Sequence, residues 1–135
     1  MTETTERFFI DTNILVYVTD GDLAKSARSR QLLNDGGVLS VQVLNEFTRV
    51  ARKKLKFSWQ EVREFLEPIR ARNEIVPLTL EIHLNGLVLA ERYQFQIFDA
   101  MIVAAALIKD CTTLYSEDMH DGLIIDGLTI RNPYR

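Results

Sequence analysis

The chain lacks the features that mark secreted and membrane proteins. Its 135 residues include one cysteine, Cys111, so no disulfide can form within the chain. No apolar run approaches the roughly 20 residues that a membrane-spanning helix requires. The first seven residues are polar and charged, with no apolar core, so we expect no signal peptide. These absences favour a cytoplasmic protein with no membrane partner.

An excess of positive charge is also missing, since the formal net charge is -3 at pH 7. A dedicated basic nucleic-acid-binding protein usually carries a net charge of the opposite sign. A nucleic-acid substrate is still compatible with this charge, because metal ions bound to carboxylates would neutralise part of it.

The length and composition predict a single domain over residues 1–135. No internal repeat, linker or low-complexity segment divides the chain, and 47% of its residues are hydrophobic. A chain of this length buries roughly two thirds of its unfolded surface, which is enough for a core without disulfides.

Short apolar strands alternate with helices, which is typical of a parallel α/β sheet. We predict strands at 8–10, 38–40, 74–78 and 112–116, with one or two more within 123–130. Helices are expected at 24–33, 41–55, 59–70, 79–93 and 99–109. Pro68 is expected to weaken the third of these helices near its end. Propensity does not decide between helix and strand for residues 14–18.

Two acidic residues follow predicted strands. Asp11 comes directly after the strand 8–10, and Asp118 follows the strand 112–116. Ligands of parallel sheets bind outside the carboxyl ends of the strands, so we expect both side chains to face one crevice. A purely structural alternative for Asp11 is to cap the segment that begins at Ile14.

Two further acids are placed by helices. Glu46 lies on the edge of the apolar stripe of helix 41–55, where it either faces a cleft or pairs with Arg49 or Lys53. Asp99 begins an almost wholly apolar helix, whose N-terminus favours negative charge even without a function. Carboxylates that converge repel one another unless cations bind between them, so a cluster of all four acids favours Mg²⁺ or Mn²⁺.

Other charged residues are weaker candidates. Side chains alternate along a strand, so Glu117 is expected to point away from Asp118, and Asp121 is the reserve candidate. His120 is more simply a solvated loop residue. A basic segment follows Glu46 and comprises Arg49, Arg52, Lys53, Lys54 and Lys56. It is either a solvated helix face or an RNA phosphate track, for which Arg49, Arg52 and Lys53 are the candidates.

Four short motifs together resemble those of PIN-domain nucleases, specifically the VapC-type toxins of type II toxin–antitoxin pairs. In chain order they are Ile10-Asp11-Thr12-Asn13, Asn45-Glu46-Phe47, Phe98-Asp99-Ala100 and Tyr115-Ser116-Glu117-Asp118-Met119. Each motif is weak alone, but their order and spacing are specific. The resemblance extends from about Phe8 to Tyr134.

The resemblance implies a three-layer α/β/α fold around a mainly parallel sheet of about four to five strands. It implies an endoribonuclease that depends on Mg²⁺ or Mn²⁺, with Asp11, Glu46, Asp99 and Asp118 as its catalytic acids. Asp11, Asp99 and Asp118 would hold the principal ion, and Thr12 and Ser116 would be the accompanying hydroxyl groups. It also implies a homodimer and a small antitoxin that covers the active site.

Several alternatives stay open or are disfavoured. A receiver domain would carry an acidic pair after the first strand, and a haloacid-dehalogenase-like phosphatase a second Asp two residues after the first. Thr12 and Asn13 stand there instead, which disfavours both. A non-catalytic PIN-like interaction module and a PIN-like DNA nuclease remain alternatives. The sequence does not determine which RNA is cut or whether one or two ions act.

Overall fold

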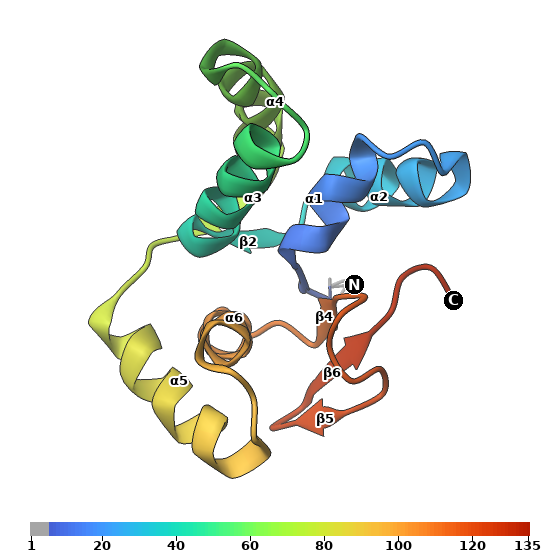
Figure 1. Cartoon of the computed structure of the whole chain (residues 1–135). Coiled ribbons are helices and arrows are strands. Elements are labelled where there is room, and N and C mark those ends of the chain that lie inside the picture. Colours follow the sequence, from blue (N-terminus) through green and yellow to red (C-terminus); the bar gives the residue numbers. More distant parts are fainter. Residues whose placement is uncertain (1–5) are drawn as a thin grey trace, which may run out of the picture.

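A six-stranded sheet in the order β3-β2-β1-β4-β6-β5 runs through the protein (Figure 1). The computed structural model describes residues 6–135. The strands are β1 (Phe8–Ile10), β2 (Val38–Ser40), β3 (Glu74–Val76), β4 (Thr113–Tyr115), β5 (Ile124–Ile125) and β6 (Leu128–Arg131). The helices are α1 (Thr12–Val18), α2 (Leu23–Asp35), α3 (Val41–Lys53), α4 (Trp59–Arg72), α5 (Leu80–Tyr93) and α6 (Ile97–Ile108).

The sheet is parallel except at one edge. The central strand β1 pairs with β2 and β4, so that Phe9 lies opposite Val38 and Ile10 lies opposite Tyr115. Only the pairing of β5 with β6 is antiparallel. The predicted mainly parallel α/β sheet is therefore confirmed. It has six strands rather than four to five, because the two-residue strand β5 extends its edge.

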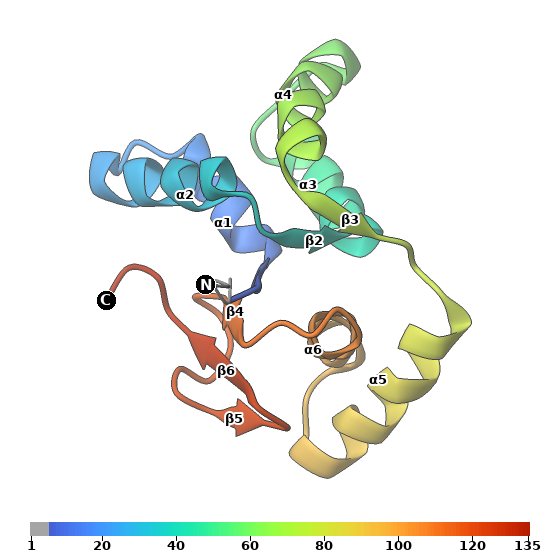
Figure 2. The same cartoon turned by 180° about the vertical axis from the view of Figure 1, so that it is seen from behind.

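Helices cover both sides of the sheet, as Figures 1 and 2 show. Helices α1 to α4 contact one another on one side, and α5 packs along α6 on the other. The core between them is apolar, and its strand residues Phe9, Ile10, Leu39 and Leu114 are fully buried. No helix among residues 6–135 is long and apolar enough to cross a membrane.

The structure decides the conformation of residues 14–18 and changes the predicted bounds of two helices. Residues 14–18 are helical, because Asp11 accepts a hydrogen bond from the Thr12 amide and caps α1. Helix α4 continues past Pro68 to Arg72, held by the burial of Val62, Leu66 and Ile69. Helix α6 begins at Ile97 rather than at Asp99, because Gln96 is the residue that caps it. Asp99 therefore lies within the first turn.

One face of α5 is apolar and exposed. Leu80, Leu84, Leu87 and Val88 recur at helical spacing, and their exposed fractions are 71%, 51%, 48% and 53%. The helix buries the opposite face, where Gly86 lies against Met101 of α6. Nothing in residues 6–135 covers this apolar face, which we call the α5 face.

Candidate active site

A cleft of about 740 Å³ lies at the carboxyl ends of the strands and is acidic on its inner wall. Its lining includes all four of the acids that the sequence predicts to converge: Asp11, Glu46, Asp99 and Asp118. They arrive from the end of β1, from α3, from α6 and from the turn after β4. The strand-end geometry of a parallel sheet thus gathers acids that are far apart in the sequence.

Asp11 lies at the bottom of this cleft, with an exposed fraction of 5%. Its Oδ1 accepts a hydrogen bond from the Thr12 amide at 2.7 Å, and its Oδ2 accepts one from Ser116 Oγ at 2.7 Å. Burial raises the pKa of Asp11 to about 7, and the charges of Asp99 and Glu46 act in the same direction. Asp11 is therefore both the cap of α1 and a buried carboxylate that no basic group neutralises in the described chain.

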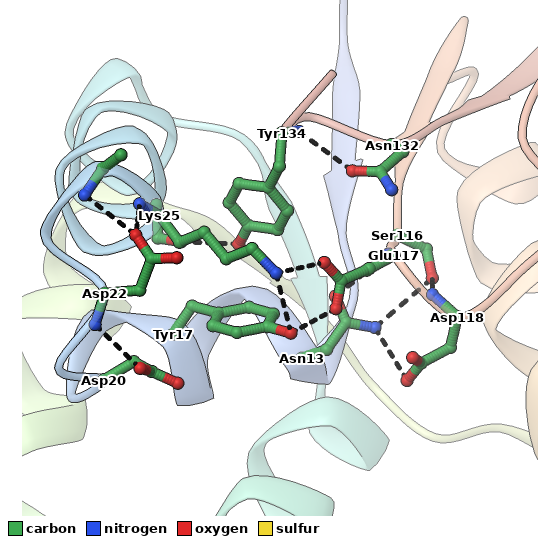
Figure 3. Close-up of polar contacts among 12 residues, drawn as sticks. Asn13, Tyr17, Asp20, Asp22, Lys25, Ser116, Glu117, Asp118, Asn132 and Tyr134 are labelled. Carbon is green, nitrogen blue, oxygen red and sulfur yellow. Dashed lines mark hydrogen bonds and ion pairs between the residues drawn. The ribbon is translucent and has the colours of Figure 1, made fainter.

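Asn13 connects Asp11 to Asp118 through its side-chain amide. Its Nδ2 donates to Asp11 Oδ2 at 3.3 Å and to Asp118 Oδ2 at 3.2 Å, and its Oδ1 accepts from the Glu117 backbone at 3.2 Å. The fully buried Ser116 hydroxyl accepts from the Asp118 amide at 3.2 Å. The turn that carries Asp118 is thereby fixed against the N-terminus of α1 (Figure 3).

Glu46 and Asp99 form the opposite wall. Glu46 is held by two neutral donors, Thr12 Oγ1 at 2.7 Å and Gln42 Nε2 at 3.0 Å. Gln42 also donates to the Phe98 carbonyl at 2.9 Å, which connects α3 to the first turn of α6. Burial raises the pKa of Asp99, and the charges of Glu46 and Asp118 add to this effect.

Comparison with known families agrees with this geometry. The sequence profile of the PIN domain matches residues 8–120, which is most of the chain and includes all four acids. The chain belongs to the PIN domain family. No curated protein was found to match it.

Solved structures share the fold of this PIN domain at low sequence identity. A toxin–antitoxin complex from Klebsiella pneumoniae superposes with a TM-score of 0.71 at 21% identity, covering 93% of this chain and 97% of that chain. VapBC2 from Rickettsia felis, bound to a promoter DNA fragment, gives 0.66 at 21% identity, with coverages of 93% and 97%. The sarcin–ricin-loop-cleaving toxin VapC20 from Mycobacterium tuberculosis gives 0.62 at 17% identity, with coverages of 82% and 89%.

The remaining acidic and imidazole candidates of this PIN domain lie apart from the four acids or are already paired. Glu117 borders the cleft, but its carboxylate accepts hydrogen bonds from Lys25 and Tyr17, of which the Lys25 bond contributes most to lowering its pKa. Asp121 accepts from the Asn132 amide at 2.7 Å and does not line the cleft. His120 is exposed and is likewise absent from the lining.

Basic residues border the mouth of the cleft on α3. Arg49, Lys53 and Lys54 line it. Arg52, which the sequence grouped with Arg49 and Lys53, does not. Its Nη1 donates to the Phe57 carbonyl at 2.8 Å, and its guanidinium lies 4.4 Å from the centroid of the Trp59 ring. Arg52 therefore braces the connection between α3 and α4, and Lys54 takes its place at the cleft.

The chemistry of the cleft suits a hard divalent cation. Its oxygen donors are carboxylates, which Mg²⁺ and Mn²⁺ prefer, and none of the four acids forms an ion pair within residues 6–135. As these side chains stand, no three His, Cys, Asp or Glu residues of the described range are close enough to hold one ion.

Sequence reasoning missed two residues of this site. Asn13 belongs to the Asp-Thr-Asn triplet, and its position two residues after Asp11 in the first turn of α1 was an available signal. Gln42 lies one helical turn before Glu46 and so shares its face, but an isolated glutamine carries no signal of its own. Thr12 and Ser116, which the resemblance implied, both bind a cleft carboxylate.

Proposed function

We propose that this PIN domain is a metal-dependent endoribonuclease and the toxin of a toxin–antitoxin pair. The observation that carries the proposal is the cleft in which Asp11, Glu46, Asp99 and Asp118 meet without a basic partner. Such a site concentrates negative charge that a divalent cation would neutralise, and the bound cation would in turn attract the anionic phosphodiester. The solved toxin structures with the same fold, one of which cleaves the sarcin–ricin loop, support RNA as the substrate.

Asp11, Asp99 and Asp118 would hold the principal ion in this proposal. Asp11 is the deepest of them and is oriented by Ser116 and by the Thr12 amide. Glu46, held by Thr12 and Gln42, would orient the attacking water or complete a second ion site. A bound divalent ion supplies an activated water and neutralises charge at phosphorus.

The neutral hydrogen-bond donors around the acids would orient the metal ligands in this proposal. Thr12, Asn13, Gln42 and Ser116 fix carboxylate directions without adding positive charge. The negative charge of the carboxylates is therefore left for the ion to neutralise. Groups that orient metal ligands in this way typically change metal affinity or activity by about 10–100-fold when they are removed.

The activity test uses the purified wild-type chain and total RNA. We expect discrete cleavage sites with Mg²⁺ or Mn²⁺ and none with EDTA. Single-stranded and duplex DNA of matched sequence serve as competing substrates. Metal-dependent cleavage of DNA but not RNA would replace the substrate in this proposal. Absence of both Mn²⁺ binding and cleavage would favour a non-catalytic interaction module.

The basic residues at the cleft mouth are proposed to guide the RNA backbone. The double substitution Lys53→Gln and Lys54→Gln is expected to raise KM for RNA by about tenfold with kcat nearly unchanged, because phosphate contacts are lost. The slope of log KM against log salt should fall by about one for each lysine. Steady-state cleavage at several salt concentrations measures both quantities.

Arg63→Gln with Arg70→Gln is the matched control for these lysines. Both arginines are exposed on α4 and lie outside the cleft lining, and their loss changes the net charge by the same amount. An equal rise in KM in this control would show that net charge, rather than a phosphate track, sets the affinity.

Two protein partners are proposed with this function. A small antitoxin is supported by the toxin–antitoxin complexes that share the fold. A second copy of this chain is proposed to cover the α5 face, because contiguous exposed apolar patches mark interfaces.

Leu84→Glu is expected to convert the dimer to a monomer in sedimentation equilibrium, since it places a charge in the middle of the α5 face. Leu23→Glu is the control, because Leu23 is 81% exposed but lies on α2. A wild-type chain that is monomeric at high concentration would contradict the proposed dimer.

A further inference from the structure

Glu117 borders the acidic cleft next to Asp118, but its carboxylate is turned toward α2 (Figure 3). Its Oε1 accepts a hydrogen bond from the Tyr17 hydroxyl, and its Oε2 accepts one from Lys25 Nζ at 2.8 Å. The side chains of Lys25 and Glu117 are 31% and 24% exposed, so the ion pair is partly shielded from water. Besides the four candidate acids, the cleft lining thus includes Glu117, which is occupied elsewhere, and the exposed Asp20, which accepts a hydrogen bond from the Asp22 amide at 2.9 Å.

Two tyrosine rings restrict the position of Lys25. Its Nζ lies 4.5 Å from the centroid of the Tyr17 ring and 5.4 Å from that of Tyr134. The two rings contact edge to face, and the Tyr134 hydroxyl is fixed by a 2.6 Å hydrogen bond to Ser29 Oγ. A cation beside aromatic faces gains electrostatic attraction, which helps to keep Lys25 at Glu117.

The backbone of Glu117 is fixed close to the four candidate acids by the same residue that holds Asp118. The Glu117 amide donates to Asn13 Oδ1, and Asn13 Nδ2 donates to Asp118 Oδ2. Only the side chain of Glu117 is therefore free to take another direction. Lys25 is the ion-pair partner of Glu117 among residues 6–135, and Arg135 acts on this carboxylate only as a weaker, unbonded charge.

We propose that Lys25 and Tyr17 are positioning residues that turn the Glu117 carboxylate away from Asp11, Glu46, Asp99 and Asp118, so that it does not join these four acids as a metal ligand. This inference rests on the proposed nuclease function. A fifth carboxylate would add negative charge beside the ion and compete with water and the RNA phosphate for it. Lys25 and Tyr17 would therefore set the charge and the ligand number of the site through the direction of Glu117.

Lys25→Met is expected to bind Mn²⁺ about tenfold more tightly than the wild type, because a carboxylate released beside the cleft strengthens the attraction for a cation. Its kcat for RNA is expected to fall by about tenfold. Calorimetric titration with Mn²⁺ alone measures the first quantity, and steady-state cleavage measures the second. Tighter metal binding with slower turnover is a signature that general loss of structure does not produce.

The double variant Lys25→Met with Glu117→Gln is expected to return both quantities to within about twofold of the wild type, since the released group no longer carries charge. Lys109→Met is the matched control. Lys109 Nζ pairs with Glu74 at 3.0 Å, and neither residue lines the cleft. If Lys25→Met does not fold, Tyr17→Phe keeps the ring and all charges and should still change both quantities in the same directions, by about twofold.

Two results would overturn the inference alone. One is unchanged or weaker Mn²⁺ binding by both Lys25→Met and Tyr17→Phe, and the other is a double variant as impaired as Lys25→Met. A wild-type chain that binds no Mn²⁺ would overturn the proposed function and this inference together. That outcome is distinguishable because it is seen before any substitution is made.

Discussion

Asp11→Asn is expected to lower the rate of metal-dependent RNA cleavage by about a thousandfold or more. The reason is that loss of a carboxylate proposed to hold the ion would raise the activation free energy by several kcal/mol. The substitution keeps the shape of the side chain and its capping oxygen for the Thr12 amide. It removes the negative charge at the bottom of the cleft. Single-turnover cleavage of the mapped RNA site, with saturating Mn²⁺, measures the effect.

Asp126→Asn is the control for this substitution. Asp126 lies in the turn between β5 and β6 with a φ of 48°, a conformation that asparagine adopts readily, and it does not line the cleft. We expect it to cleave RNA at the wild-type rate. Full metal-dependent cleavage by Asp11→Asn would remove Asp11 from the catalytic assignment.

The affinity for Mn²⁺ is expected to rise about tenfold per pH unit from about pH 5 and to level off above about pH 7. The reason is that burial raises the pKa of Asp11 to about 7, and an ion binds only to the deprotonated carboxylate. Asp99, whose pKa is also raised, steepens the dependence in the same direction. Titration calorimetry at several pH values, in buffers of different ionisation enthalpy, gives both the affinity and the protons released.

The same pKa gives the metal-free protein a stability that falls with pH. The folded chain holds the Asp11 proton more tightly than the unfolded chain, so this contribution is full below about pH 4 and is lost as pH rises through about 7. Asp11→Asn has no such proton and should lack this part of the decline. The stability of its metal-free form relative to the wild type should therefore be greater at about pH 8 than at about pH 4. Thermal unfolding across this range tests the sign, and a parallel decline in Asp11→Asn would contradict it.

The acids could be chosen from the sequence because each interrupts an apolar element at its end. Asp11 follows a buried strand, Asp118 follows another, and Asp99 stands near the start of an apolar helix. Glu46 was ambiguous, because a residue at the edge of a stripe faces either a cleft or solvent. Its position was decided by the packing of α3 beside α1, which brings Thr12 Oγ1 within 2.7 Å, and no local pattern contains that information.

The sequence did not show which of the basic residues lie at the cleft. Arg52 and Lys54 are equivalent in charge and nearly adjacent in sequence, but α3 ends at Lys53 and the chain then turns toward Trp59. The guanidinium of Arg52 donates to the Phe57 carbonyl in this connection, whereas Lys54 lines the cleft. The helix boundary therefore decides which of the two basic side chains lines the cleft. Sequence patterns place such boundaries least accurately, because helix ends depend on capping and on tertiary contacts.

The order of strands in the sheet has a consequence for when the candidate active site forms. The central strand β1 is bordered by β4, and the hydrogen bond between Ser116 and Asp11 joins residues 105 positions apart. Pairing over such a separation forms slowly, and a chain still being synthesised lacks it until β4 has emerged from the ribosome. Until then the edge of β1 is open and the cleft has neither Ser116 nor Asp118. Formation of the sheet and assembly of the candidate active site are thus one event, and a chain still being synthesised does not yet hold its four acids in one cleft.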